Sequence, residues 1–580
     1  MNYKALYQTW LSDDYYDEGT KEELRGIAGQ EAEIEDRFFR TLHFGTAGLR
    51  GIMGAGSNRI NVYTIRRATQ GLADYIIQQK KQSMGVVIAY DSRHRSSEFA
   101  LEAALCLAGN GIKAYLFEEL RPTPELSFAI RHLRCVAGIN ITASHNPPEY
   151  NGYKVYWEDG AQITPPHDGG IMEMAEAIAD HNHIHTLSEK DAVQQQLLQY
   201  IGKETDDAYA EEIKRLILDP EETKQLAANI KIVYTPLHGA GGRPVERLLR
   251  EIGFKQVWVV KEQQKPDGDF PTVTQPNPES KDAFNLALQL AEEKHADVIL
   301  ATDPDADRLG VYVYNKKTKG FEALTGNVSG VLLAYYELSR KKELQQLPEN
   351  GVLLKSIVTT GLLNEIGAHF GLETREVLTG FKWIGKSMLE LEQSGQHAFL
   401  FGMEESYGCL AGTYCRDKDA VAATVLFCEA AAYYSKQGKS LWEVLQFLYE
   451  TYGYFYEGTI SLTLTGIEGM KKIQCVMEIL REDPAVVSEL FSVEKIIDYQ
   501  RGIQYDRRTG ETTETGLPRA EVLFYRLLGA DWFCVRPSGT EPKLKFYYGI
   551  KGDNEAEKAD KIQKTENKLH KLIKMLTEQQ

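Results

Sequence analysis

Three aspartates at alternate positions could hold a metal ion. The stretch ATDPDADRLGV places Asp303, Asp305 and Asp307 directly after DVILA, an apolar run that predicts a buried strand. Carboxylates crowded on one loop repel one another unless a hard cation lies among them. An EF-hand is excluded, because Arg308 stands where that loop requires glycine. The spacing predicts a Mg²⁺ site shared with a phosphate, and a solvated acidic turn is the alternative.

A serine also follows an apolar run. The stretch ITASHNPPEYNGYKVY begins where CVAGINI, a predicted strand, ends, and it displays Ser144 and His145 on the loop. Loops at strand ends often carry catalytic side chains. Ser, Asn and Pro are equally ordinary turn residues, so from these residues alone a turn and a chemically active serine both stay open.

Several other loops carry groups that could bind an anion or a sugar. In CVRPSGTEPKLK, hydroxyls and backbone N–H groups beside Arg536 could form an anion nest, and a hairpin turn is an equal explanation. Further arginines gather in HFGTAGLRGIMGAGSNRIN and DSRHRSS, at Arg50, Arg59, Arg93 and Arg95. In FGMEESYG, paired acceptors could hold sugar hydroxyls or cap a helix N-terminus.

One pattern favours a different function. GFKWIGKS, residues 380–387, satisfies the Walker A spacing of a nucleotide-binding P-loop and lies between a strand-like and a helix-like segment. Bulky residues such as Phe381 and Ile384 stand where small residues help the backbone wrap around phosphate. A P-loop kinase or ATPase using Lys386 is therefore an alternative that we disfavour.

The elements that must position these residues form a repeated pattern. Segments starting at Gly85, Lys231 and Val352 each show a strand, a polar or glycine-containing loop, an amphipathic helix and a second strand. This order is typical of a βαβ unit in an α/β domain. The wide spacing of the three segments favours whole domains in tandem over a solenoid.

The last part of the chain differs in character. From Tyr454 onward, GTISLTLTG and CVRPSGTEPKLKFYYGIKG show the alternation of an antiparallel sheet, and a charged helix closes the chain. The sequence thus predicts three tandem, similar α/β domains and a smaller C-terminal α+β domain. We place the four domains at residues 1–205, 206–325, 326–453 and 454–580.

Composition limits the classes of function. The chain has 580 residues, a formal net charge of -17 and a pI near 5.4, which argues against a nucleic-acid surface and requires any anion to be bound in a local basic cleft. Seven cysteines without a CxxC pair suggest reduced thiols. Neither a signal peptide nor a membrane span is expected, so we predict a soluble cytoplasmic protein.

Taken in order, TASHNP with NGYK, DPDADR, MEES and RPSGTEPK resemble the motifs of the α-D-phosphohexomutase superfamily. The resemblance covers nearly the whole chain, and the TGFKWIG and MEESYG forms are most similar to bacterial α-phosphoglucomutases, in the branch that includes phosphopentomutase and glucose-1,6-bisphosphate synthase. It implies four domains around one central cleft. In chain order, the four domains would carry the phosphoserine, the metal site, the sugar-recognition loop and the phosphate-binding loop.

The resemblance also implies site roles. Ser144 would carry a phosphoryl group, with its phosphate and Asp303, Asp305 and Asp307 around Mg²⁺. Arg50, His145 and Lys154 would stabilise charge or relay the proton. The implied substrate-binding residues are Arg308, Lys382, Trp383, Glu404, Ser406, Arg536, Ser538, Gly539 and Thr540.

The implied reaction interconverts glucose 1-phosphate and glucose 6-phosphate through glucose 1,6-bisphosphate, which would also act as activator. Small sugar phosphates would be the partners, with no nucleic acid or membrane, and the protein would be a monomer or dimer. Because Tyr407 and Phe381 stand where some hexomutases have histidine, mannose or a pentose stays open as the sugar, as does bisphosphate synthesis. A non-catalytic sugar-phosphate sensor is disfavoured, because the serine and all three aspartates are present.

Overall fold

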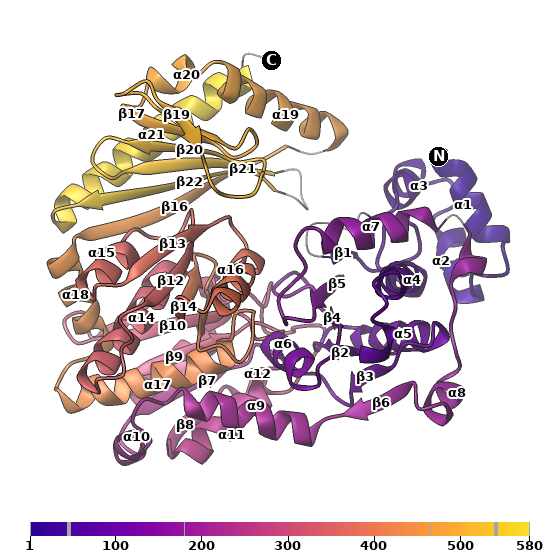
Figure 1. The fold of residues 1–580 in the computed structure, drawn as a ribbon, viewed down its shortest axis with the longest axis horizontal. Helices are drawn as coiled ribbons and strands as arrows, with labels where there is room; N and C mark the ends of the chain where they lie inside the picture. The colour runs from indigo at the N-terminus through magenta and orange to yellow at the C-terminus, as the bar shows by residue number, and fades with distance from the viewer. Residues whose placement is uncertain (1, 43–47, 179, 465, 539–542, 579–580) are drawn as a thin grey trace.

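Four β-sheets follow one another along the chain in the computed structural model, which describes residues 2–42, 48–178, 180–464, 466–538 and 543–578. We number the domains after their sheets. In Figure 1 the first domain lies on the right, the third on the left, and the fourth above the third. Among the described residues, no sheet crosses a predicted domain boundary, and those boundaries themselves stay a prediction.

The three predicted βαβ units are confirmed, and in each one the two strands pair in parallel. They are β2 (Val86–Tyr90), α5 (Ser96–Gly109) and β3 (Ala114–Phe117); β7 (Lys231–Thr235), α11 (Gly242–Ile252) and β8 (Gln256–Val259); and β12 (Gly351–Ser356), α15 (Leu362–His369) and β13 (Glu373–Val377). Helix α11 ends where Gly253 adopts a left-handed conformation with φ of 116°, which suits a residue without a Cβ. Parallel strands bring their carboxyl ends to one edge of each sheet, where loops can carry functional groups.

The first sheet has the order β1-β5-β4-β2-β3-β6, and its remaining strands are β1 (Gly48–Ile52), β4 (Ala137–Ile141), β5 (Tyr150–Trp157) and β6 (Leu198–Ile201). Strand β5 is antiparallel to both of its neighbours. Helices α4 (Val62–Gln78), α6 (Thr123–His132) and α7 (His167–Ala177) also belong to this domain. Because β4 and β5 pair directly, the loop between them holds Ser144 close to Lys154.

The second sheet, of order β11-β10-β9-β7-β8, adds β9 (Val298–Thr302), β10 (Leu309–Asn315) and β11 (Gly320–Leu324). The third, of order β13-β12-β14-β15, adds β14 (Ala398–Glu404) and β15 (Gly408–Ala411), which pair as a hairpin. One continuous cluster of buried hydrophobic side chains joins these two domains through α14 (Gly326–Glu343) and α17 (Ala420–Lys436). They therefore share a core.

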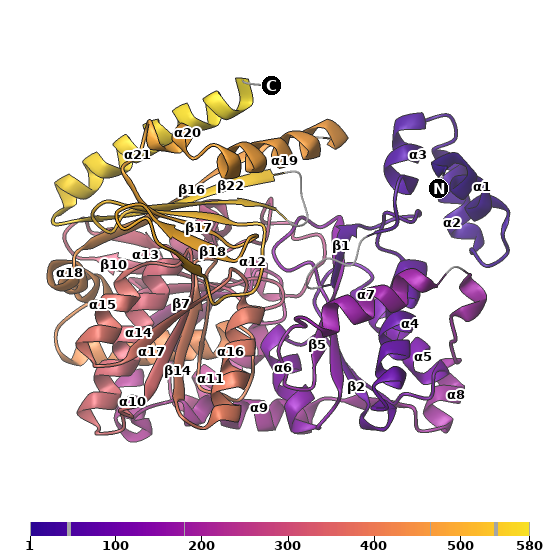
Figure 2. The same cartoon turned by 45° about the horizontal axis from the view of Figure 1, so that its top comes forward.

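The fourth sheet is antiparallel, as predicted, with the order β16-β22-β21-β20-β17-β18-β19. Its strands are β16 (Tyr454–Thr463), β17 (Val493–Asp498), β18 (Ile503–Asp506), β19 (Thr512–Glu514), β20 (Leu523–Leu527), β21 (Trp532–Pro537) and β22 (Lys543–Gly552). Helices α19 (Gly466–Glu482) and α21 (Glu555–Glu578) cover one face, and the other faces the third domain (Figure 2).

Three helices precede the first sheet, α1 (Tyr3–Ser12), α2 (Glu18–Gly26) and α3 (Glu31–Phe38), and lie at one end of the molecule (Figure 1). An aromatic cluster that includes Trp10 and Phe38 packs them against Tyr63 of α4. Their polar contacts hold the loop after β1, since Asp36 pairs with Arg59 at 2.6 Å. Arg59 thus stabilises the fold here.

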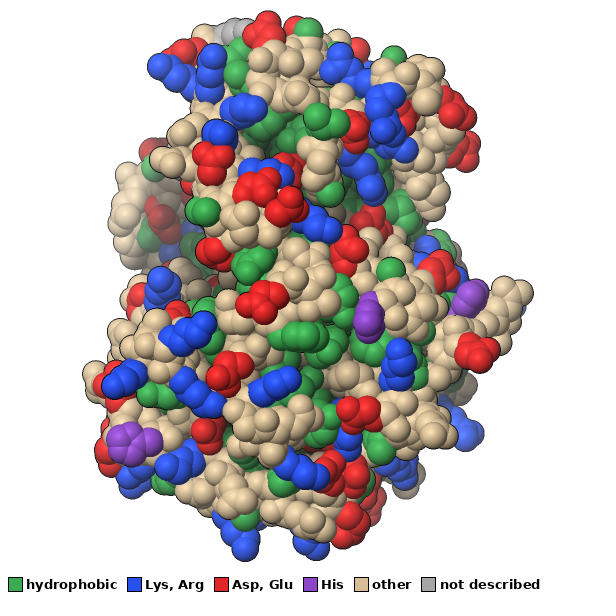
Figure 3. Space-filling model, turned by 90° about the vertical axis from the view of Figure 1, so that its left-hand side faces the viewer, with side chains coloured by type: hydrophobic (Ala, Val, Ile, Leu, Met, Phe, Trp, Pro, Cys, Tyr) green, Lys and Arg blue, Asp and Glu red, His purple; other side chains and the backbone are tan. Residues whose placement is uncertain are grey.

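Charges of both signs are interspersed on the face shown in Figure 3, as the acidic but mixed composition predicts. None of the described helices combines the length and the low polarity needed to span a bilayer.

Candidate active site

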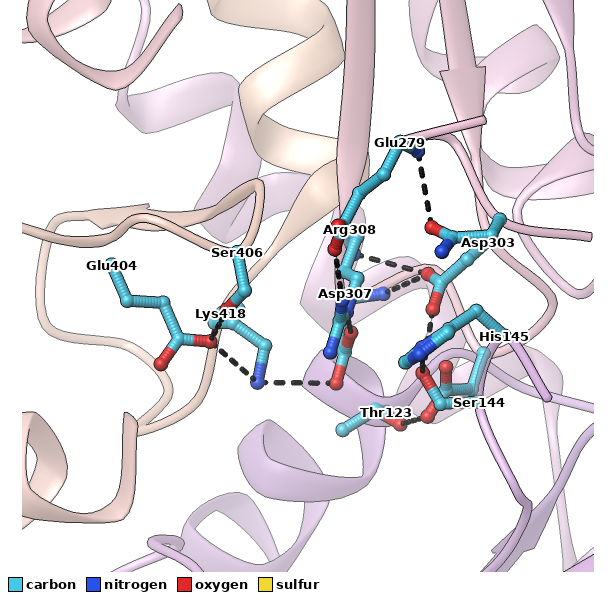
Figure 4. Close-up of polar contacts among 12 residues, drawn as sticks. Thr123, Ser144, His145, Glu279, Asp303, Asp307, Arg308, Glu404, Ser406 and Lys418 are labelled. Carbon is cyan, nitrogen blue, oxygen red and sulfur yellow. Dashed lines mark hydrogen bonds and ion pairs between the residues drawn. The ribbon is translucent and has the colours of Figure 1, made fainter. Parts of the chain in front are cut away.

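Ser144 lies on the loop that follows β4, as predicted, and it is only 2% exposed. Its backbone is left-handed, with φ of 53°, which is uncommon for a residue with a Cβ. Its hydroxyl donates to Asp303 Oδ2 at 2.7 Å and lies 3.2 Å from His145 Nδ1 (Figure 4). The structure thus places the serine of the first domain directly against the acidic loop of the second.

The acidic loop begins where β9 ends, and its three aspartates are buried. One carboxylate oxygen from each of Asp303, Asp305 and Asp307 lies within 4.8 Å of the others. Asp303 Oδ1 accepts hydrogen bonds from the backbone N–H groups of Asp307 and Arg308, at 3.1 and 3.0 Å (Figure 4). Thr123 of α6 donates to Asp305 Oδ2 at 2.8 Å. The loop is therefore held in one shape by contacts within and across domains.

This cluster fits a divalent cation. Asp305 Oδ1 and Asp307 Oδ1 are buried and have no hydrogen-bond partner, which would be costly for carboxylates left alone. Burial, together with the charges of Asp305 and Asp307, raises the pKa of Asp303 well above its usual value. A hard cation bound by these oxygens would satisfy them and reverse that shift.

Cationic side chains surround the acidic loop. Lys154 Nζ on β5 contacts Asp305 Oδ2 at 2.7 Å and Asp307 Oδ2 at 3.5 Å. Burial lowers the pKa of Lys154, but the two carboxylates raise it by more, so the net shift is upward. Arg50 on β1 donates to Asn146 Oδ1 at 3.1 Å, and Arg308 pairs with Glu279 at 2.5 Å. The predicted groups Arg50, Lys154 and Arg308 therefore lie around one centre.

The surroundings of His145 change its pKa. Burial, with the nearby charges of Arg308 and Arg50, lowers its pKa well below the ordinary histidine value. These surroundings favour the neutral form of the imidazole. Its Nδ1 is the ring nitrogen nearest to the serine hydroxyl.

The MEES stretch forms the end of β14 and the turn to β15, so it does not cap a helix. Ser406 Oγ donates to Glu404 Oε1 at 2.7 Å, which presents both side chains at one place (Figure 4). Lys418 bridges this turn to the acidic loop, with Nζ 3.8 Å from Glu404 and 3.2 Å from Asp307. Lys418 thereby joins the third domain to the acidic loop.

Lys382 and Trp383, which the resemblance assigns to substrate binding, lie in the first turn of α16 (Phe381–Ser394). Lys382 is 9% exposed, and its Nζ lies 3.9 Å from Asp168. Burial lowers its pKa to about 8. The same helix removes the P-loop alternative, because residues 381–387 form regular helical turns and Lys386 lies over the ring of Trp383 at 5.6 Å.

Arg536 is the residue before the last one of β21. Its charge lowers the pKa of Lys382 and opposes the rise that burial and Glu404 impose on the pKa of Glu405. Ser538 follows in the turn toward β22, whereas Gly539 and Thr540 lie outside the described residues. The charge of an arginine in the fourth domain is thus felt at the MEES turn and at the start of α16.

Residues that sequence reasoning missed complete the centre. Thr123, Glu279 and Lys418 contact Asp305, Arg308 and Asp307 respectively. Only Lys418 gave a signal, as a lysine between two aspartates in CRDKDA directly before an apolar helix. Arg95 lies in the basic loop before α5, but its side chain is exposed and pairs with Glu98 at 2.7 Å, so it does not join the centre.

Comparison with known proteins agrees with this arrangement. Family models for phosphoglucomutase/phosphomannomutase alpha/beta/alpha domains I, II and III match residues 41–182, 207–316 and 325–452. Curated proteins named phosphoglucomutase are similar over most of both chains. The one from Staphylococcus saprophyticus is 36% identical over 94% of this chain and 95% of its own, and one from Staphylococcus aureus is 37% identical over 92% and 94%.

Solved structures share the fold. A phosphoglucomutase/phosphomannomutase family protein from Burkholderia thailandensis covers 91% of this chain and 97% of its own, with a TM-score of 0.63 and 19% identity. The open form of parafusin from Paramecium covers 90% and 93%, with a TM-score of 0.67 and 18% identity. With three matched domains and relatives at 36–37% identity along nearly the full length, the chain belongs to the phosphoglucomutase/phosphomannomutase family of the α-D-phosphohexomutase superfamily, whose members are intramolecular phosphotransferases.

Proposed function

We propose that this chain interconverts α-D-glucose 1-phosphate and glucose 6-phosphate, with Ser144 as the phosphoryl carrier and glucose 1,6-bisphosphate as intermediate and activator. The observation that carries the proposal is the 2.7 Å contact between Ser144 Oγ and Asp303 in a buried cluster of three carboxylates. A serine that served only as a turn residue would not need a second domain's acidic loop against its hydroxyl.

In the proposed cycle, phosphoserine 144 transfers its phosphoryl group to the free hydroxyl of a sugar monophosphate. The bond from phosphorus to Ser144 Oγ breaks as the bond to the sugar oxygen forms, and the sugar hydroxyl loses its proton. His145, whose Nδ1 lies beside the serine hydroxyl, would relay that proton, and Lys154 and Arg50 would stabilise the negative charge on the transferring oxygens. After the bisphosphate turns round, its other phosphate returns to Ser144.

Asp303, Asp305 and Asp307 would hold Mg²⁺, together with an oxygen of the phosphoserine. When bound, Mg²⁺ supplies Lewis-acid stabilisation of the phosphoryl oxygens. The unpartnered oxygens of Asp305 and Asp307 support this assignment. Arg308, kept charged by Glu279 and Asp307, would add a fixed positive group beside the same oxygens.

The remaining groups would bind the part of the substrate that does not react. Glu404 and Ser406 offer acceptors for sugar hydroxyls, with Lys382 and Trp383 at the neighbouring helix start. Arg536, with Ser538, Gly539 and Thr540, would hold the distal phosphate. Glucose is proposed as the sugar because the relatives at 36–37% identity are named phosphoglucomutases.

The seven described cysteines form no disulfide, which agrees with a cytoplasmic location. A monomer or dimer stays the prediction for the oligomeric state.

The test combines a rate with a mass. We expect Mg²⁺-dependent conversion of glucose 1-phosphate in a coupled assay with a trace of glucose 1,6-bisphosphate, faster than with mannose 1-phosphate or ribose 1-phosphate. Peptide mapping should find phosphate on Ser144. Ser144→Ala should lower turnover by about three orders of magnitude or more, whereas the exposed Ser435→Ala should not change it. Absence of phosphate on Ser144, even after incubation with the bisphosphate, would refute the carrier role.

A further inference from the structure

One arginine, Arg93, is hydrogen-bonded to the loop that carries Ser144. Arg93 follows β2, and its side chain is fully buried. Nη2 donates to the carbonyl oxygen of Ser144 at 2.5 Å and to that of Asn146. Nη1 donates to the carbonyl oxygens of Pro147 and Tyr150, at 2.7 and 3.1 Å. One guanidinium therefore bonds three carbonyls of the loop between β4 and β5 and a fourth at the first residue of β5.

These contacts leave Arg93 no donor for a substrate. The guanidinium has five N–H groups in a fixed fork. Four are directed at carbonyls, and the fifth, on Nε, is buried and makes no hydrogen bond, although it lies 3.3 Å from Asp91 Oδ2. The sequence suggested that Arg93 belongs to an anion-binding loop, and the structure corrects this expectation, because four of its N–H groups bind backbone carbonyls and the whole side chain is buried.

Asp91 connects Arg93 to the other side of the Ser144 peptide. Asp91 Oδ2 accepts a hydrogen bond from Thr142 Oγ1 at 2.6 Å, and Thr142 Oγ1 accepts one from the backbone N–H of Ser144 at 2.8 Å. Arg93 binds the carbonyl oxygen of the same residue. Both polar backbone groups of Ser144 are thus fixed by one buried network, which maintains the left-handed conformation that aims its hydroxyl at Asp303.

The second domain reaches the same arginine. Phe270 is completely buried, and its ring lies against the guanidinium of Arg93, with Cζ 5.0 Å from the ring centroid. Nearby, Asp269 contacts His94 at 2.7 Å, and a Cβ on Gly268 would approach the backbone nitrogen of His94 to 2.7 Å. The segment 268–270 therefore packs closely on the loop that carries Arg93.

We infer that Arg93 is a positioning residue, which sets the orientation of the Ser144 hydroxyl, and that Phe270 makes this orientation depend on the docking of the second domain. The inference rests on the proposed phosphoserine role. Because a misplaced phosphoryl donor slows transfer but leaves the sugar and distal-phosphate contacts intact, loss of Arg93 should act on kcat and not on KM.

The test is Arg93→Lys, matched by Arg95→Lys at the exposed arginine two residues on. A lysine ammonium cannot reproduce the four-carbonyl fork. We expect kcat to fall by about 10-fold to 100-fold with KM for glucose 1-phosphate within about threefold, and amide exchange in the peptide covering residues 142–150 to accelerate. Arg95→Lys should change none of these. Phe270→Leu should lower kcat by about threefold to tenfold, again without a change in KM.

Two results would overturn the inference. One is a folded Arg93→Lys protein with wild-type kcat and wild-type exchange, and the other is a raised KM at unchanged kcat, which would indicate a direct contact with substrate. If Arg93→Lys does not fold, Phe270→Leu decides, and wild-type kcat in that variant rejects the coupling to the second domain. If the unaltered protein shows no mutase activity and no phosphate on Ser144, the proposed function fails. The amide-exchange comparison then still judges the role of Arg93.

Discussion

At the scale of single residues, the acidic loop divides its oxygens between two tasks. Asp305 Oδ2 accepts from Thr123 and Lys154, whereas its Oδ1 has no partner. Asp303 similarly uses Oδ1 for backbone N–H groups and Oδ2 for Ser144. One oxygen of each carboxylate anchors the residue, and the other remains for an incoming group. This division explains why an amide, which replaces one oxygen by a donor, is a severe substitution here.

Asp305→Asn should therefore weaken Mg²⁺ binding by about tenfold or more and lower turnover with it, because the site loses a charge and a possible ligand. Calorimetric titration of the metal-free protein with Mg²⁺ measures the first effect without substrate. The exposed Asp282→Asn, in the same domain, is the matched control and should bind Mg²⁺ normally. Equal Mg²⁺ affinity in both variants would contradict the metal assignment.

Lys382 provides a prediction on pH. Burial lowers its pKa to about 8, so the ammonium is present below pH 8 and is lost as the pH rises through that value. If Lys382 binds substrate oxygens in its charged form, KM for glucose 1-phosphate should rise by about tenfold between pH 7 and pH 9. Lys382→Arg should remove this dependence, because arginine stays charged throughout. A KM that is flat with pH in the unaltered enzyme argues against the role.

At the scale of elements, the start of α16 decides between two readings of one motif. A Walker loop wraps irregular backbone around phosphate, whereas Phe381–Ser394 begins its helical turns directly after Gly380, whose φ is 111°. The G-x-x-x-x-G-K-S spacing is thus a coincidence of helix-forming residues. The mutase and the P-loop alternative predict opposite results for the substitution of Lys386.

Lys386→Ala should change mutase activity by less than about tenfold and abolish no ATP binding, because Lys386 lies on Trp383 and reaches no phosphate loop. Arg536→Ala on β21 is the contrasting variant. Loss of a bidentate phosphate contact should cost about 2 to 4 kcal/mol, a fall in kcat/KM of roughly thirtyfold to a thousandfold. Tight ATP binding that disappears with Lys386 would favour the nucleotide-binding alternative.

The sequence was most informative about elements. Apolar runs such as DVILA and CVAGINI predicted β9 and β4, because a strand that is buried on both faces is a nearly continuous run of apolar residues. The aspartates and Ser144 were then found as the residues directly after these strands. Thr123 and Glu279 were missed because their partners lie far away in the sequence. The sequence does not decide whether Lys382 lies in a loop or in a helix, because a glycine followed by bulky residues suits both.

At the scale of the molecule, residues of the third and fourth domains line a partly open pocket of about 250 Å³. Glu457 of β16 lines it, and its Oε1 is buried without a hydrogen-bond partner. Burial raises the pKa of this carboxyl to about 7, although Lys355 of β12 lies in the same pocket. The folded protein therefore keeps Glu457 protonated up to a pH at which the unfolded chain has already ionised it.

This raised pKa makes stability fall as the pH rises. The cost is absent below the unfolded pKa of 4.5, grows through pH 7, and is fully present above it. Glu457→Gln should consequently stabilise the protein at pH 8 by about 1 to 3 kcal/mol and have little effect at pH 4.5. Thermal unfolding of both proteins at the two pH values measures this. A gain that is equal at both pH values would show that ionisation is not the cause.

The burial and left-handed backbone of Ser144 also affect how a phosphate on this residue is interpreted in a proteome. A protein kinase must draw an extended segment into its own active site, and this segment is closed by Arg93 from one side and Asp303 from the other. If Ser144 carries the phosphoryl group as proposed, phosphate found on it in a cell extract would therefore come from sugar-phosphate turnover and not from a protein kinase.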